Sequence, residues 1–159
     1  MASPNANTYT IHKSATISTA ITIMQLQASA TKPFEILRAW CTQSSSTATN
    51  QISIALLRKN AAATVTAAVS ADIGSSNPSN ATTCGLQLGI AGTGYNASVE
   101  GTDGVYLDDW GFNVLTGWLW LPVPEERTMV AANGVIALKF TTAPASGTFR
   151  FGMTINELG

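Results

Sequence analysis

The sequence predicts an all-β fold, an antiparallel β-sandwich of about eight to ten strands with a jelly-roll-like arrangement. Apolar and polar residues alternate with a period of two in most segments, which is typical of strands with one buried face. Clusters of Gly, Pro, Asn and Ser separate these segments at short intervals. Charged residues make up only 11% of the 159 residues, and Thr, Ser, Asn and Gly, which favour strands and turns, replace them.

The first residues of the chain differ from the rest of the sequence. Residues 1–7 are mostly polar and include Pro4 and Asn5, so we expect a flexible arm there. Strand patterns begin at Thr8 and continue without an internal repeat. We therefore predict one β-sandwich domain over 8–159.

Alternating residues predict five strands in the first part of the chain. These strands cover 8–13, 15–27, 34–43, 51–60 and 64–70. The polar tract 44–50 is suited to joining the third and fourth strands as a hairpin. The segment ALLRKNAAA contains good helix formers, but the alternating start of 51–60 favours a strand. Within 34–43, strict alternation places Trp40 on the same face as Phe34 and Ile36.

The second part of the chain shows the same pattern with more turn signals. Its predicted strands cover 86–90, 95–100, 112–122, 129–131, 135–141 and 148–155. We expect loops over 74–83 and 106–111, the latter an acidic stretch that crosses the end of a sheet. In 112–122, Trp118 and Trp120 share one face, and Pro122 ends the strand because proline cannot continue a ladder.

The low charge of the chain indicates which kinds of partner it can bind. The net charge is -1 and Arg58-Lys59 is the only adjacent basic pair, so binding to nucleic acid through phosphate neutralisation is not expected. Uncharged polar groups are cheaper to desolvate than charges, and a weakly charged surface repels itself less. Both properties favour a homo-oligomer, with a soluble monomer as the alternative.

No catalytic or metal site is predicted, and no cofactor. His12 is the only histidine, so a histidine cluster cannot be built. A catalytic triad would have to use His12, which lies near the flexible start of the chain, where we expect poor positioning. Asp103, Asp108 and Asp109 are a candidate calcium site. Their spacing does not match an EF-hand loop, and an ordinary acidic loop is the alternative.

The tryptophans and cysteines carry further hypotheses. Trp110, Trp118 and Trp120 could stack on sugars, but Trp118 and Trp120 stand among leucines, which favours a core or a subunit interface. Cys41 is expected to be a buried free thiol, with pairing to Cys84 as the alternative.

The sequence shows neither a signal peptide nor a membrane-spanning apolar run. We therefore expect the protein to be made in a host cytoplasm and to have no membrane partner. A protein made there can still leave the cell inside a particle.

Four stretches together resemble a known family. FEILRAWCTQSSSTATNQISIALLRK, EGTDG, FNVLTGWLWLPVPEER and GVIALKF are similar to short proteins encoded among the structural genes of tailed bacteriophages and in viral metagenomes. The likeness covers about residues 34–157, and GWLWLPVPEER is its most specific part. The family is poorly characterised, so the resemblance implies a virion role and supplies no catalytic residue. Residues 2–7 match no pattern of the family.

In size and composition the chain also resembles capsid decoration, or cement, proteins, which are often β-rich and trimeric. This likeness implies a homotrimer that binds the major capsid protein on the capsid surface and stabilises the head. Contacts are expected from Trp110, Trp118, Trp120, Pro4 and Asn5. The alternatives are a carbohydrate- or receptor-binding module of a phage tail or fibre and a capsid-forming jelly roll.

Overall fold

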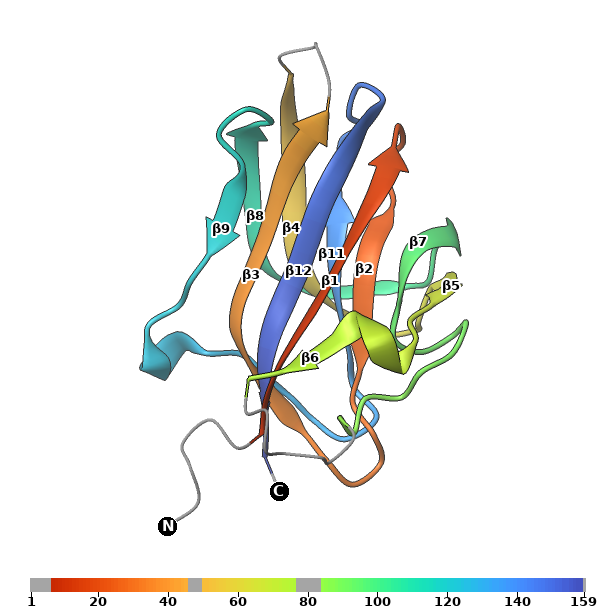
Figure 1. Ribbon diagram of the computed structural model, residues 1–159, viewed down its shortest axis with the longest axis vertical. Helices are drawn as coiled ribbons and strands as arrows, with labels where there is room; N and C mark the ends of the chain where they lie inside the picture. Colours follow the sequence, from red (N-terminus) through yellow and green to blue (C-terminus); the bar gives the residue numbers. More distant parts are fainter. Residues whose placement is uncertain (1–6, 46–49, 77–83, 159) are drawn as a thin grey trace.

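The computed structural model describes residues 7–45, 50–76 and 84–158, and contains two six-stranded antiparallel sheets packed face to face (Figure 1). Sheet A consists of β1 (Thr8–Ile17), β3 (Phe34–Ser45), β6 (Ile73–Ser75), β9 (Trp118–Trp120), β10 (Met129–Val130) and β12 (Gly147–Glu157). Sheet B consists of β2 (Thr22–Gln27), β4 (Gln51–Lys59), β5 (Thr64–Ala67), β7 (Gly94–Val99), β8 (Asp103–Asn113) and β11 (Val135–Phe140). The helical residues of the described chain form two short 3-10 turns, η1 (Ser70–Asp72) and η2 (Pro124–Glu126). The predicted all-β sandwich is thus confirmed.

The strands pair in a nested order. β1 pairs with β12, β2 with β11, β3 with β9 and β4 with β8. The neighbours in sheet A therefore run β9-β3-β12-β1, and those in sheet B run β8-β4-β11-β2. This is the arrangement of a jelly roll, in which a long antiparallel hairpin is folded over into two sheets.

The segment between β4 and β8 extends one edge of the sandwich. β7 and β5 continue sheet B beyond β2, and β6 continues sheet A beyond β1; β5 and β7 are seen at the right of Figure 1. Part of this segment also lies on the outer face of sheet B, where the amide of Gln25 bonds to the backbone of Ala63 and Gly92. Among the described residues, the edge formed by β8 and β9 has no such extension.

The core lies between the sheets and is built from the alternating residues that the sequence pattern indicates. β12 contributes four fully buried side chains, Phe149, Phe151, Met153 and Ile155. Phe149 meets Phe140 of β11 edge to face, with ring centroids 5.0 Å apart. Burying one such side chain contributes roughly 1.5 to 3 kcal/mol, so these contacts between the sheets dominate the stability of the sandwich.

An ion-pair network lies on the outer face of sheet B. Nζ of Lys59, whose side chain is 0% exposed, lies 2.8 Å from Asp103 Oδ1 and 3.1 Å from Glu100 Oε2. Nζ of Lys139 lies 2.6 Å from Asp103 Oδ2. Glu100 also accepts hydrogen bonds from the backbone and hydroxyl of Thr22. Its Oε2 also lies 3.6 Å from Nζ of Lys139, so the Glu100 carboxylate joins β2, β4 and β11 and fastens the β7–β8 connection across the sheet.

The network changes the acidity of both carboxyl groups. Burial opposes ionisation of Glu100, but hydrogen bonds from Thr22 and Lys59 outweigh it and lower the pKa of Glu100. Burial likewise opposes ionisation of Asp103, and hydrogen bonds from Lys139 and Lys59 lower its pKa. Both groups therefore favour the folded state most strongly when ionised.

Several predicted boundaries were wrong. The predicted strand 15–27 is two strands, since residues 18–21 turn the chain from sheet A to sheet B. Strand 64–70 stops at Ala67, and 86–90 forms only isolated bridges. Strand β6 begins at Ile73 and takes in the first two residues of the predicted loop 74–83, most of which lies outside the described residues. Alternation alone does not reveal where a strand leaves its sheet.

The acidic stretch 106–111 is part of β8 and not a loop, because β4 pairs with it along its length. The predicted strand 112–122 is interrupted by a turn at 114–117.

A β-bulge corrects the predicted faces of β3. The register with β12 shifts opposite Thr154 and Ile155, so Ile36 pairs with Ile155 and Arg38 with Thr154. The extra residue, Leu37, reverses the alternation. Ile36 stays inside the core, whereas Trp40 lies on the outer face of sheet A.

The ion-pair network predicts an acid-dependent stability. In the unfolded chain Glu100 and Asp103 take up protons in the ordinary range near pH 4, but in the folded protein they do so only at lower pH. Their contribution is therefore complete above that range and is lost as the pH falls through the lower folded pKa values. We expect urea denaturation to show a smaller fall in unfolding free energy between pH 6 and pH 3 for Glu100→Gln than for the wild type.

Glu125→Gln is the matched control, because Glu125 is exposed and belongs to none of the ion pairs among the described residues. It should keep the wild-type pH dependence. An unchanged pH dependence in Glu100→Gln would contradict the assignment.

Candidate functional site: a tryptophan groove at the open edge

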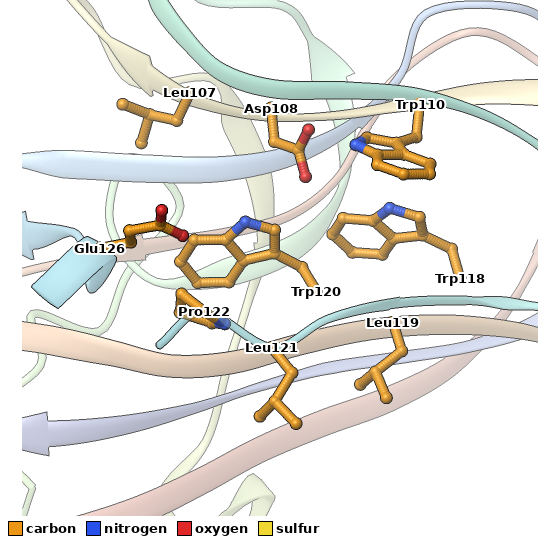
Figure 2. Close-up of a pocket in the computed structure, with 9 residues that line it drawn as sticks. All are labelled: Leu107, Asp108, Trp110, Trp118, Leu119, Trp120, Leu121, Pro122 and Glu126. Atoms are coloured by element: carbon orange, nitrogen blue, oxygen red, sulfur yellow. The ribbon is translucent and has the colours of Figure 1, made fainter. Parts of the chain in front are cut away.

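The sandwich is open between β8 and β9, which are edge strands of opposite sheets. A groove of about 390 Å³ lies there (Figure 2). Its lining comes from β8, from β9 with the chain beyond it, and from η2. The lining residues are Leu107, Asp108, Trp110, Trp118, Leu119, Trp120, Leu121, Pro122 and Glu126.

Three indoles fill the opening to different depths. Trp118 is 6% exposed and belongs to the core. Trp120 is partly buried and packs against the core, whereas Trp110 is 58% exposed. The groove is thus the place where the apolar interior reaches the surface. The structure brings together all three tryptophans that the sequence analysis singled out.

A tight turn places β9 opposite β8. Oδ1 of Asn113 accepts a hydrogen bond from the backbone of Leu115, and its carbonyl accepts one from Thr116. Gly117 has φ +71°, a conformation that side chains disfavour. A Cβ there would also contact Thr42 of β3. These residues bring Trp118 next to Cys41 in the register of sheet A.

Carboxylates flank the indoles. The pairing of β8 with β4 shifts at Leu107, and such a bulge redirects side chains. The carboxylate of Asp108 points into the groove, and Glu126 lies at the end nearest Trp120 (Figure 2). Neither takes part in an ion pair within the described ranges. Aromatic faces beside free carboxylates can bind an apolar side chain or a sugar, whose hydroxyls would donate hydrogen bonds to the carboxylates.

The acidic calcium candidates are not gathered into one site. Asp103 pairs with two lysines at the start of β8, Asp108 faces the groove, and Asp109 is exposed next to it in the strand. Successive residues of a strand point to opposite faces. Among the described residues no group of three or more His, Cys, Asp or Glu side chains is arranged to bind a metal.

Exposed apolar side chains continue outward from the groove. The side chains of Leu119 and Leu121 point away from the indoles (Figure 2) and are 62% and 68% exposed. Eight of the twelve large exposed hydrophobic residues in the described chain lie between 105 and 129. We call these eight the apolar side: Val105, Tyr106, Trp110, Leu115, Leu119, Leu121, Val123 and Met129.

The remaining candidates lie elsewhere. His12 is exposed in the middle of β1 and so is well positioned, contrary to the expectation from its place near the start of the chain. Pro4 and Asn5 lie outside the described residues.

Both cysteines are free thiols. Burial raises the pKa of Cys41 far above its ordinary value and that of Cys84 to about 12. Both are therefore protonated and unreactive at neutral pH.

Sequence reasoning missed two features of the groove, the roles of Asp108 and Glu126. The Trp-x-Trp alternation signalled one wall, but the other wall depends on the bulge in β8.

Within the part of the chain that is described, no helix is long and apolar enough to cross a membrane. The chain matches no family model, no curated protein and no solved structure, so function has to be argued from the groove and the surface.

The graded burial of the indoles predicts unequal costs of truncation. Trp118→Ala should lower the unfolding free energy by about 3 to 5 kcal/mol, because it leaves a cavity in the core. Trp110→Ala should cost about 1 kcal/mol or less, since most of its ring stays in water in both states. Urea denaturation followed by circular dichroism measures both, and equal costs would contradict the described depths.

Proposed function

We propose that this chain is a structural protein of a bacteriophage virion, a decoration protein that binds the outer capsid lattice as a homo-oligomer and stabilises the head. The virion setting rests on the resemblance of GWLWLPVPEER and its companion stretches to phage structural proteins. The observation that carries the proposal is the apolar side, which suits contact with another protein chain.

The apolar side suits a second copy of this chain. Large apolar side chains exposed along the edge strands of a soluble protein commonly mark an interaction site. Leu119 and Leu121 point outward from one wall of the groove, and Trp110 stands on the opposite wall (Figure 2); aromatic residues are enriched at protein interfaces. Burying such residues contributes about 25 cal/mol per Å². Only 11% of the chain is charged, so little repulsion opposes self-association.

The mechanism would be passive. A rigid sandwich forms a trimer through the apolar side, and each subunit then contacts the major capsid protein. Three weak contacts on one trimer bind far more tightly than one, because the second and third occur at high effective concentration. Residues 1–7, with Pro4 and Asn5, are proposed to bridge neighbouring capsid subunits.

A second candidate function is carbohydrate binding, as in a tail or fibre module. The observation that favours it is the exposed ring of Trp110 with Asp108 beside it in the groove. An indole face packs against a sugar ring, and a carboxylate accepts hydrogen bonds from the sugar hydroxyls.

Self-association predicts a mass that depends on the apolar side. We expect the wild type to sediment as a trimer at micromolar concentration in analytical ultracentrifugation. The double variant Leu119→Glu/Leu121→Glu should dissociate at a concentration at least about ten-fold higher, because two charges would be buried at the interface.

The matched control is Leu88→Glu/Ile90→Glu, which places two charges on exposed residues outside the apolar side. It should keep the wild-type mass. A wild-type monomer at high micromolar concentration would refute self-association.

Cryo-electron microscopy of the phage particle tests where the chain is located. Density for this chain on the tail would refute capsid decoration. Closed shells formed by the protein alone would indicate a capsid-forming jelly roll.

Carbohydrate binding in the groove predicts quenching of indole fluorescence by neutral oligosaccharides. The quenching should disappear in Trp110→Ala, because the exposed ring is then absent. Quenching that survives this substitution would exclude the groove as the sugar site.

A further inference from the structure

The outer face of sheet A carries a second aromatic site, centred on Trp40. The strand register places His12, Gly152 and Trp40 in one row across β1, β12 and β3. A Cβ at position 152 would overlap the six-membered ring of Trp40. The indole therefore lies over Gly152, and the absence of a side chain there lets it lie close to the sheet.

Arg38 restrains the indole further. Its guanidinium carbon lies 5.0 Å from the centroid of the Trp40 ring, a cation–π contact. Its Nε donates a 2.9 Å hydrogen bond to the hydroxyl of Thr154, which is 3.0 Å from that of Thr10. The benzo edge of Trp40 lies against Gly152 and Arg38 contacts the ring, so the indole is fixed before any ligand arrives, and part of it lines a pocket.

A pocket of about 500 Å³ adjoins this indole, a size within the usual range for small-molecule sites. It is lined by His12, Lys13, Ser14, Trp40, Asp72, Arg150 and Phe151. Lys13 and Asp72 neutralise each other at 2.8 Å. Arg150 is exposed and has no carboxylate partner among the described residues. The free charge in the pocket is thus positive, beside a fixed aromatic ring and a hydroxyl.

We propose that this pocket binds a carboxylated sugar, such as a hexuronic acid unit of an acidic polysaccharide. The fork of the Arg150 guanidinium matches a carboxylate with two parallel hydrogen bonds. The apolar face of the sugar ring packs on Trp40, and Ser14 and Asp72 bond to its hydroxyls. A simple inorganic anion would use Arg150 but leave the indole unused, and a neutral sugar would leave the guanidinium unpaired.

The site lies on the outer face of sheet A and is distinct from the tryptophan groove. It requires neither the virion setting nor self-association, so it stands or falls separately from the proposed function.

Isothermal titration of the full chain at physiological salt tests the proposal with three probes: an oligoglucuronate, an oligoglucose of the same length and inorganic phosphate. We expect saturable binding of the oligoglucuronate, at least about ten-fold weaker binding of the oligoglucose, and no competition from equimolar phosphate. Arg150→Gln should weaken oligoglucuronate binding about ten-fold or more, as expected for the loss of a charged hydrogen bond, and should remove the preference over oligoglucose. Trp40→Leu should weaken binding of both sugars.

Arg58→Gln is the matched control, since Arg58 is also exposed, belongs to sheet B and lines no part of this pocket. It should bind like the wild type, and thermal unfolding confirms that each variant is folded. Absence of saturable oligoglucuronate binding would overturn the proposal, as would equal competition by phosphate or an unchanged affinity in Arg150→Gln. If no sugar binds and Arg150→Glu lowers the sedimenting mass instead, the face is a contact between copies of the chain, and the proposal is likewise overturned.

Discussion

The antiparallel pairing of β1 with β12 determines where the other strands can lie. With these two strands as neighbours, β3 lies beyond β12 in sheet A. β2 and β11, which come after β1 and before β12 in the chain, are led into sheet B as the next nested pair. Each further pair is placed in the same way. The interior is then filled by side chains from both halves of the chain, as the contact of Phe140 with Phe149 illustrates.

The two edges of this sandwich differ because one long connection adds strands to only one of them. The segment between β4 and β8 adds strands beside β1 and β2, and the Lys59 network anchors its last part across sheet B. At the other edge, neither β8 nor β9 has a further strand beside it in the described part of the chain. Indoles close it instead, and the outermost, Trp110, remains exposed. Unpaired strand edges favour association with another chain, and β8 and β9 are such edges within the described residues.

The sequence was most informative where one face of a strand is simply buried. The alternation of Phe149, Phe151, Met153 and Ile155 predicted β12 nearly to its ends. Alternation failed at the bulges in β3 and β8, because a bulge is defined by the partner strand and not by local residues. The place of Trp40 depends on Gly152, and that of Asp108 on pairing with β4. Both aromatic sites thus use residues whose neighbours come from distant parts of the sequence.

The pairing of charges has an electrical consequence for the whole molecule. Five of the nine carboxylates are in ion pairs; the other four, Asp108, Asp109, Glu125 and Glu126, lie along β8 and η2. Three arginines, Arg38, Arg58 and Arg150, have no carboxylate partner within the described ranges; Arg38 and Arg150 lie on the outer face of sheet A, and Arg58 belongs to sheet B. A chain with a net charge of -1 therefore has an uneven charge distribution, with its unpaired carboxylates together along β8 and η2. In the field of a charged surface it would rotate during its approach, so that one side arrives first, and salt would weaken this orientation.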